Sequence, residues 1–101
     1  MNTIEEWVKA STECAQDHGF KVTEDNLPGH LMLVVTEVAE AMEEWRLPEE
    51  GYMDRLTEEL SDVILRTFNI AGFLNLPLED VMRKKHAKNL GRPFKHGGKR
   101  L

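Results

Sequence analysis

Apolar residues recur along most of the chain at intervals of three and four positions, the spacing that places side chains on one side of an α-helix. The pattern predicts four helices, which span about residues 3–18, 30–45, 52–74 and 77–91. No stretch shows the alternation of apolar and polar residues that is typical of a β-strand. The sequence therefore predicts an all-α fold.

The boundaries of these helices follow from capping and breaking residues. Asn2 or Thr3 can cap the first helix, and Gly19 can end it. Pro28 and Gly29 break the chain before the second helix, so we expect that helix to begin near His30.

The two central helices each carry two carboxylates three residues apart. Glu37 and Glu40 lie on one side of the second predicted helix, and Glu59 and Asp62 lie on one side of the third. Each pair has a similar angular offset from the apolar stripe of its own helix, so four carboxylates meet if the stripes pack together. The stripes are Leu31, Val34, Val38 and Trp45 on one helix, and Leu56, Leu60, Val63 and Thr67 on the other.

Four converging carboxylates require a positive partner, because their repulsion would be comparable to the whole stability of a small domain. Oxygen ligands favour a hard cation, and Mg²⁺ commonly combines protein carboxylates with water and substrate phosphates. We therefore expect these four side chains to hold Mg²⁺, for which Mn²⁺ can substitute, in a site for nucleotide chemistry. A solvated acidic face is the alternative that the spacing leaves open.

The charge of the chain is divided unequally along its length. All 18 acidic residues lie in residues 1–80 with 5 Lys and Arg, a net charge of −13. Residues 81–101 carry 8 Lys and Arg and no acid, a net charge of +8. The chain therefore supplies its own counter-charge.

The basic segment carries a polar stripe. Lys85, Asn89 and Arg92 follow at i, i+4 and i+7, so on a continuing helix they could meet phosphate oxygens and a sugar hydroxyl. A solvated cationic helix end is the alternative. Nucleic acid is a less favoured partner, because Phe94 is the only aromatic residue in this segment and the acidic remainder of the chain would repel a polyanion.

Length and composition indicate a single domain over residues 1–101, with a basic tail at residues 92–101 that contains Gly and Pro. A monomer of this size buries about 60–65% of its unfolded surface, so we expect a homo-oligomer. No apolar run approaches the 18 residues of a membrane span, and the acidic start is not that of a cleavable leader. We expect a cytoplasmic protein. Its one cysteine, Cys14, cannot form an internal disulfide.

The histidines and large aromatic residues carry no assignment to a site. None of the histidines has the neighbouring Glu of a zinc hydrolase or a di-iron bundle, and aromatic residues at helical spacing are usually core or interface. These residues are His18, His30, His86, His96, Trp7, Phe20 and Trp45.

Two motifs together resemble those of the MazG-like family of all-α nucleoside triphosphate pyrophosphohydrolases, which includes dimeric dUTPases and phosphoribosyl-ATP pyrophosphohydrolase. Glu37-Val-Ala-Glu40, 18 further residues and Glu59-Leu-Ser-Asp62 are similar to the family's E-x-x-E and E-x-x-D signature. Lys85-x-x-x-Asn89-x-x-Arg92 is similar to its K-x-x-x-N-x-x-R element. The resemblance covers about residues 28–93.

The resemblance implies a four-helix MazG-like bundle assembled as a dimer or tetramer. It also implies Mg²⁺-dependent cleavage of an NTP or dNTP to the monophosphate and pyrophosphate, with metal ions on the four carboxylates activating water. Lys85, Asn89 and Arg92 would bind the nucleotide. The preferred base stays open, and the alternative is a helical module that binds a nucleotide or a partner without turnover.

Overall fold

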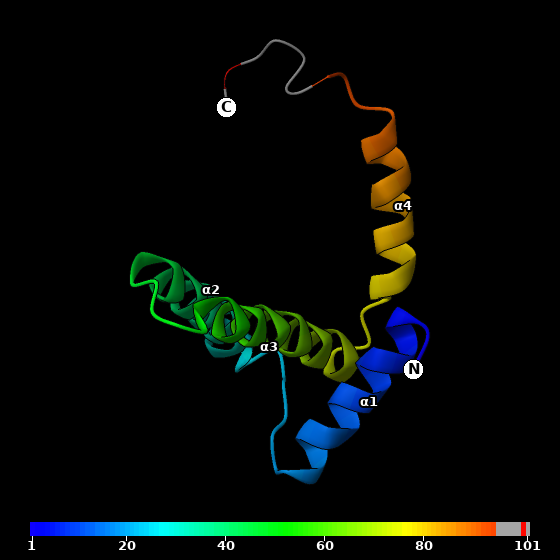
Figure 1. Cartoon of the computed structure of the whole chain (residues 1–101). Helices are drawn as coiled ribbons and strands as arrows, with labels where there is room; N and C mark the ends of the chain where they lie inside the picture. The colour runs from blue at the N-terminus through cyan, green and yellow to red at the C-terminus, as the bar shows by residue number, and fades with distance from the viewer. Residues whose placement is uncertain (95–99, 101) are drawn as a thin grey trace.

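All the regular secondary structure in residues 1–94 and 100, the part that the computed structural model describes, is α-helical (Figure 1). The helices are α1 (Ile4–Asp17), α2 (Leu27–Arg46), α3 (Tyr52–Phe73) and α4 (Leu78–Leu90). The all-α prediction is confirmed for these residues. The prediction for the basic tail falls partly on residues 95–99 and 101, which lie outside the described residues, as does His96.

Helix α1 begins and ends at the residues that the sequence indicates. The Thr3 hydroxyl accepts a hydrogen bond from the Glu6 N–H at 3.1 Å, and the Glu6 carboxylate accepts one from the Asn2 N–H at 3.3 Å. This reciprocal arrangement satisfies amides that have no partner inside the helix. Gly19 follows the helix with a φ of +84°, a conformation that glycine adopts without strain.

Helix α2 begins three residues earlier than expected, at Leu27. The expectation that Pro28 and Gly29 keep the helix from starting before His30 was wrong. Pro28 lies in the first turn, where a backbone N–H has no helical partner and the fixed φ of proline suits the helix. The preceding loop is held by Asn26, which accepts from the Thr23 N–H at 2.7 Å and donates to the Lys21 carbonyl at 2.9 Å.

Helices α2 and α3 lie side by side and run antiparallel, and α1 packs across the second half of α3 (Figure 1). The core cluster of Val8, Phe68 and Ala71 lies at this crossing. It is small for the length of the chain. The radius of gyration is 16.3 Å, whereas a compact domain of about 100 residues has about 13 Å.

Helix α4 departs from the other three helices. Leu78 in its first turn packs against the core cluster, but every residue from Asp80 to Leu90 is exposed. One chain therefore does not enclose α4 in a bundle, and Figure 1 shows it standing away from α2 and α3. None of the described helices is long and apolar enough to cross a membrane.

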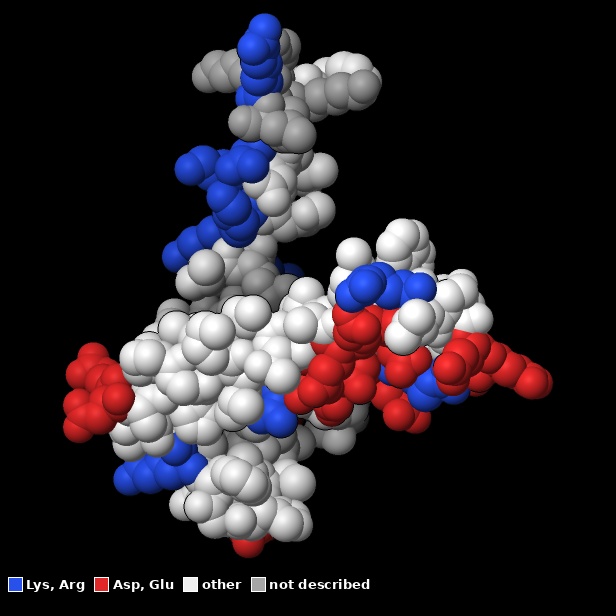
Figure 2. Space-filling model, turned by 90° about the vertical axis from the view of Figure 1, so that its left-hand side faces the viewer, with Lys and Arg blue, Asp and Glu red and all other residues white. Residues whose placement is uncertain are grey.

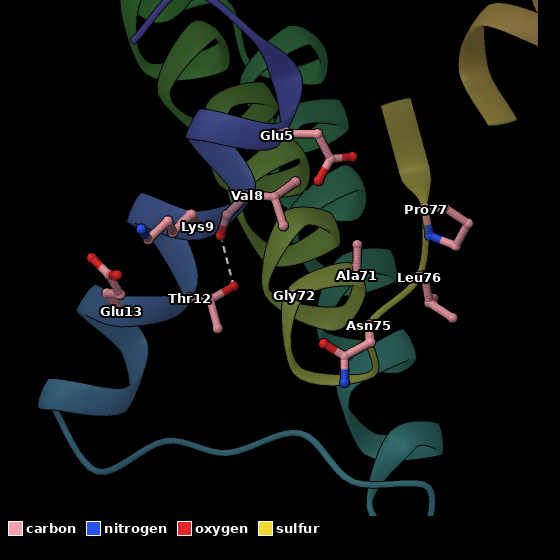
Figure 3. A pocket seen from close by; sticks show the side chains of 10 residues that line it. All are labelled: Glu5, Val8, Lys9, Thr12, Glu13, Ala71, Gly72, Asn75, Leu76 and Pro77. Carbon is pink, nitrogen blue, oxygen red and sulfur yellow. Dashed lines mark hydrogen bonds between the residues drawn. The ribbon is translucent and has the colours of Figure 1, made fainter. Parts of the chain in front are cut away.

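The close approach of α1 and α3 depends on Gly72. Figure 3 shows Thr12 of α1 directed toward Gly72, and the Thr12 hydroxyl donates to the Val8 carbonyl at 2.7 Å. A Cβ atom on Gly72 would overlap the Thr12 side chain. The hydrogen bond of Thr12 holds that side chain in place, so the crossing tolerates only glycine here.

We expect Gly72→Ala to lower the free energy of unfolding by about 1–3 kcal/mol, because the added methyl group overpacks the crossing. Gly29→Ala is the matched control, because a Cβ there meets nothing within 4 Å and alanine favours a helix. Urea unfolding of both variants measures the difference. Equal midpoints for the two variants would show that α1 and α3 do not pack this closely.

Candidate metal centre between α2 and α3

The face of α2 that meets α3 carries carboxylates. Val34, Glu37, Ala41 and Glu44 follow one another at helical spacing, and Glu37 is only 7% exposed. Two arginines of α3 bind this face. Arg66 Nε donates to Glu37 Oε1 at 3.1 Å, and Arg55 Nε donates to Glu44 Oε2 at 2.8 Å.

The expectation that the two predicted apolar stripes pack together was wrong for several of their members. Leu31, Val38 and Trp45 of α2 are 50–61% exposed, and Leu60 of α3 is exposed as well. The seam between the helices instead holds the small Ala41 with the two ion pairs beside it. The apolar residues of α2 were expected to pack against α3, but most of them are exposed.

Three of the four expected ligands converge at this seam. Carboxylate oxygens of Glu37, Glu40 and Glu59 all lie within 4.8 Å of one another. Asp62 does not belong to this group and is exposed. It follows Glu59 by three residues on α3, so it lies at the edge of the cluster rather than within it.

Two carboxylate oxygens of the cluster have no hydrogen-bond donor among the described residues. Oε2 of Glu37 and Oε2 of Glu59 are both buried and have no hydrogen-bond partner there. Burying a carboxylate oxygen without a partner is costly. Arg66 is the one cation bound to these three side chains in the described residues, and it binds Glu37 alone. The cluster therefore has room for further positive charge.

Protonation is one way in which the cluster can relieve its repulsion. A hydrogen bond to Glu37, followed by one to Glu40, raises the pKa of Glu59 to about 7. The same hydrogen bond from Glu59 lowers the pKa of Glu37, and Arg66 adds to this effect against the opposing effect of burial. A proton on Glu59 would therefore relieve part of the repulsion that a divalent cation among these carboxylates would also relieve.

An apolar pocket of about 610 Å³ lies beside this seam, between α1, the α1–α2 loop, α2 and α3. Arg66 lines it and also binds Glu37, so the pocket and the carboxylates share a residue. The aromatic residues Trp7, Phe20 and Phe73 line it, together with the polar residues Ser11, His30 and Asn69.

Trp7, Phe20 and His30 were predicted to belong to no site, and the structure brings them to one pocket. They come from α1, the following loop and the start of α2, so only the packing of α1 on α3 places them together. Inside the pocket the Ser11 hydroxyl donates to Asn69 Oδ1 at 2.6 Å, which fixes the amide of Asn69.

The predicted substrate-binding residues lie elsewhere. Lys85 and Asn89 are exposed on α4, which ends at Leu90, so Arg92 lies just beyond the helix. The Arg92 N–H donates to the Asn89 carbonyl at 3.2 Å, which keeps Arg92 close to the helix end. Within one chain, the structure does not bring these residues to the carboxylates.

A scan of family models, a search of curated proteins and a search of solved structures each returned no match to this chain.

We expect the pKa of Glu59 to make stability depend on pH when no cation is bound. Its pKa is raised from 4.5 to about 7 on folding, so its contribution is complete below about pH 4.5 and is lost as the pH rises through about 7. The lowered pKa of Glu37 acts only below pH 4.5, outside this window.

Melting temperatures with a chelator should therefore fall less between about pH 5 and pH 8 for Glu59→Gln than for the unchanged chain, because glutamine does not titrate. Glu58→Gln, one residue away and exposed, is the control and should leave the pH dependence unchanged. Identical profiles for all three proteins would contradict the raised pKa of Glu59.

Proposed function

We propose that this chain is a Mg²⁺-dependent nucleoside triphosphate pyrophosphohydrolase of the MazG-like type, which cleaves an NTP or dNTP to the monophosphate and pyrophosphate. The observation that carries the proposal is the pair of buried, unpartnered oxygens of Glu37 and Glu59 beside Glu40. The two sequence motifs support it.

The carboxylates fit a hard divalent cation. All the atoms that could coordinate the ion are carboxylate oxygens, and they come from two helices. Among the described residues, two of these oxygens have no hydrogen bond that would compete with a metal ion. Glu37, Glu40 and Glu59 would hold the ion, and the exposed Asp62 could join them from the edge. Bound Mg²⁺ supplies positive charge for the phosphates and lowers the pKa of a water molecule.

The different surroundings of Glu37 and Glu40 indicate different roles in the proposed reaction. Glu37 is bound by Arg66 and its pKa is lowered, so it is a weak base that keeps its charge. Glu40 is exposed and has no ion-pair partner in the described residues, so it can accept a proton from the attacking water. We therefore assign the role of general base to Glu40.

The apolar pocket has the character of a nucleoside site. It is mainly apolar and aromatic with a few polar groups, which is the usual composition of a small-ligand pocket. Leu33 lines it and precedes Glu37 by one helical turn, a rise of about 6 Å. A nucleotide with its base in this pocket could place its phosphates at the carboxylates.

We also propose that the chain works as a homo-oligomer, as a dimer or tetramer. Helix α2 carries a second stripe of large apolar side chains that this chain leaves exposed over its whole length. A continuous apolar stripe of this kind usually marks an interface. Its members are Leu31, Val35, Val38, Met42 and Trp45.

The direct test is incubation of the purified protein with each NTP and dNTP, with Mg²⁺ or with a chelator, followed by identification of the products. We expect equal amounts of monophosphate and pyrophosphate, and none with the chelator. Orthophosphate as the first product would refute the proposal. Melting shifts with nucleotide but no product would instead favour the binding module.

We expect Glu40→Gln to lower kcat by about 100-fold or more, because it removes the proton acceptor and one of the three carboxylates that would hold the ion. Glu43→Gln, one turn away on α2 and paired at the surface with Arg46, is the matched control and should keep its activity. Steady-state rates with the best substrate measure both. Equal loss in the two variants would show that the effect comes from the charge of α2 and not from the site.

A further inference from the structure

Arg66 of α3 connects the carboxylate cluster to the apolar pocket. Its Nε donates to Glu37 Oε1 at 3.1 Å, and the same residue lines the pocket. Glu37 is buried, whereas the side chain of Arg66 is 40% exposed. Arg66 therefore lies at the boundary between a buried carboxylate and the pocket, and part of its surface stays accessible to a ligand.

The side of α3 that carries Arg66 changes in chemical character along the helix. Glu59, Asp62, Arg66, Asn69 and Phe73 follow one another at intervals of three and four, so they lie along one side of the helix. Glu59 belongs to the carboxylate cluster, and Asn69 and Phe73 line the pocket. At about 1.5 Å per residue, Arg66 lies roughly 10 Å along the helix from both Glu59 and Phe73. It is therefore the midpoint between the carboxylates and an aromatic wall of the pocket.

A comparison with Arg55 shows that Arg66 has unused hydrogen-bond donors. Both arginines of α3 bind a glutamate of α2 through Nε. Arg55 also donates from Nη1 to the Glu50 carbonyl at 2.9 Å. Within the described residues, the two terminal nitrogens of Arg66 make no hydrogen bond. Because a guanidinium has five N–H donors, most of those of Arg66 remain for a ligand.

Arg66 also supplies positive charge where little is present. Among the described residues that line the pocket, it is the one Lys or Arg, and none is Asp or Glu. Figure 2 shows Lys and Arg gathered along the projecting α4, and Asp and Glu gathered apart from it on the body of the molecule. An anionic group on a ligand in the pocket would therefore be bound by Arg66.

We infer that Arg66 is a substrate-binding residue whose terminal guanidinium nitrogens bind the α-phosphate of a nucleotide with its base in the apolar pocket. The inference rests on the proposed function for the identity of the ligand as a nucleotide. The α-phosphate joins the nucleoside to the outer phosphates, and Arg66 has the corresponding place between the pocket and the carboxylates. A planar guanidinium suits this task because it can donate to two phosphate oxygens at once.

The ion pair with Glu37 prepares Arg66 for this contact. A long, flexible side chain loses rotamer freedom when it binds a phosphate, and that loss weakens binding. The bond from Nε to Glu37 already restricts the side chain of Arg66 before a ligand arrives. Arg66 belongs to neither of the two sequence motifs, so the sequence predicted no role for it. The alternative is that Arg66 only neutralises Glu37.

The test compares each deoxynucleoside 5′-monophosphate with its deoxynucleoside, in NMR titrations of the ¹⁵N-labelled chain with a chelator present. The two probes differ only in the phosphate, so the ratio of their dissociation constants measures the phosphate contact, and the chelator removes metal ions as its partner. We expect Arg66→Gln to lower this ratio by about 10-fold or more, because charge-assisted hydrogen bonds are lost. The affinity for the deoxynucleoside should stay the same.

Three further variants separate a phosphate contact from a structural role. Arg55→Gln is the matched control, because it removes the other Arg–Glu pair between α2 and α3 and does not line the pocket. It should leave the ratio unchanged. Arg66→Lys keeps the charge without the planar fork and should recover part of the ratio. Glu37→Gln removes the ion pair but keeps the guanidinium, so its ratio should be at least that of the unchanged chain.

Several results would overturn the inference. One is an unchanged ratio in Arg66→Gln, and another is the absence of binding by every monophosphate. A third is an equal loss in Arg66→Gln and Glu37→Gln, which would show that the ion pair matters and the guanidinium does not.

The titrations do not depend on cleavage, so they separate failure of the inference from failure of the proposed function. A phosphate contact that depends on Arg66, in a chain that releases pyrophosphate from no triphosphate, would support the inference and refute the proposed function. Pyrophosphate release together with an unchanged ratio in Arg66→Gln would overturn the inference alone.

Discussion

The stability of the contact between α2 and α3 depends on how the buried carboxylates there are neutralised. Glu37 is buried between the two longest helices, and Glu40 and Glu59 bring their oxygens to within 4.8 Å of it. Arg66 binds one oxygen of Glu37 and leaves buried oxygens of Glu37 and Glu59 without a donor in the described residues. An apolar contact would be easier to stabilise, so the carboxylates lower the stability of the free chain, as is common at functional sites and as the proposed metal site would explain.

The same priority is visible in the distribution of apolar side chains. The buried core consists of a few residues at the crossing of α1 and α3, whereas α2 exposes a full apolar stripe and α4 exposes most of its surface. A chain with so small a core would gain stability by burying these surfaces against another copy, as the proposed homo-oligomer would do. The proposed metal site would likewise compensate the buried carboxylates.

Much of the secondary structure could be predicted because its causes are local. Thr3 and Gly19 delimit α1 by capping and by backbone conformation, and α3 spans nearly the predicted range. The placement of Glu37 and Glu40 on one side of α2 also follows from helical geometry alone. The start of α2 was mispredicted, because a proline such as Pro28 can either break a helix or lie in its first turn.

Features that depend on packing could not be predicted in this way. The periodic pattern of α2 contains two apolar stripes, and nothing in the helix itself says which one faces α3. The ion pairs of Arg55 and Arg66 decide this, and they join residues 11 and 29 positions apart. The pocket around Trp7 and Phe20 likewise requires α1 to cross α3 at Gly72, a contact between distant parts of the sequence.

The proposed function would explain why a chain with an acidic site also has a basic helix. Carboxylates alone would repel a triphosphate, and lysines alone would bind the carboxylates and close the site. Metal ions on the carboxylates would reverse the local charge, and basic residues opposite them could then bind the outer phosphate oxygens. Within one chain, α4 projects away from α2 and α3, so Lys85 on this helix does not neutralise these carboxylates.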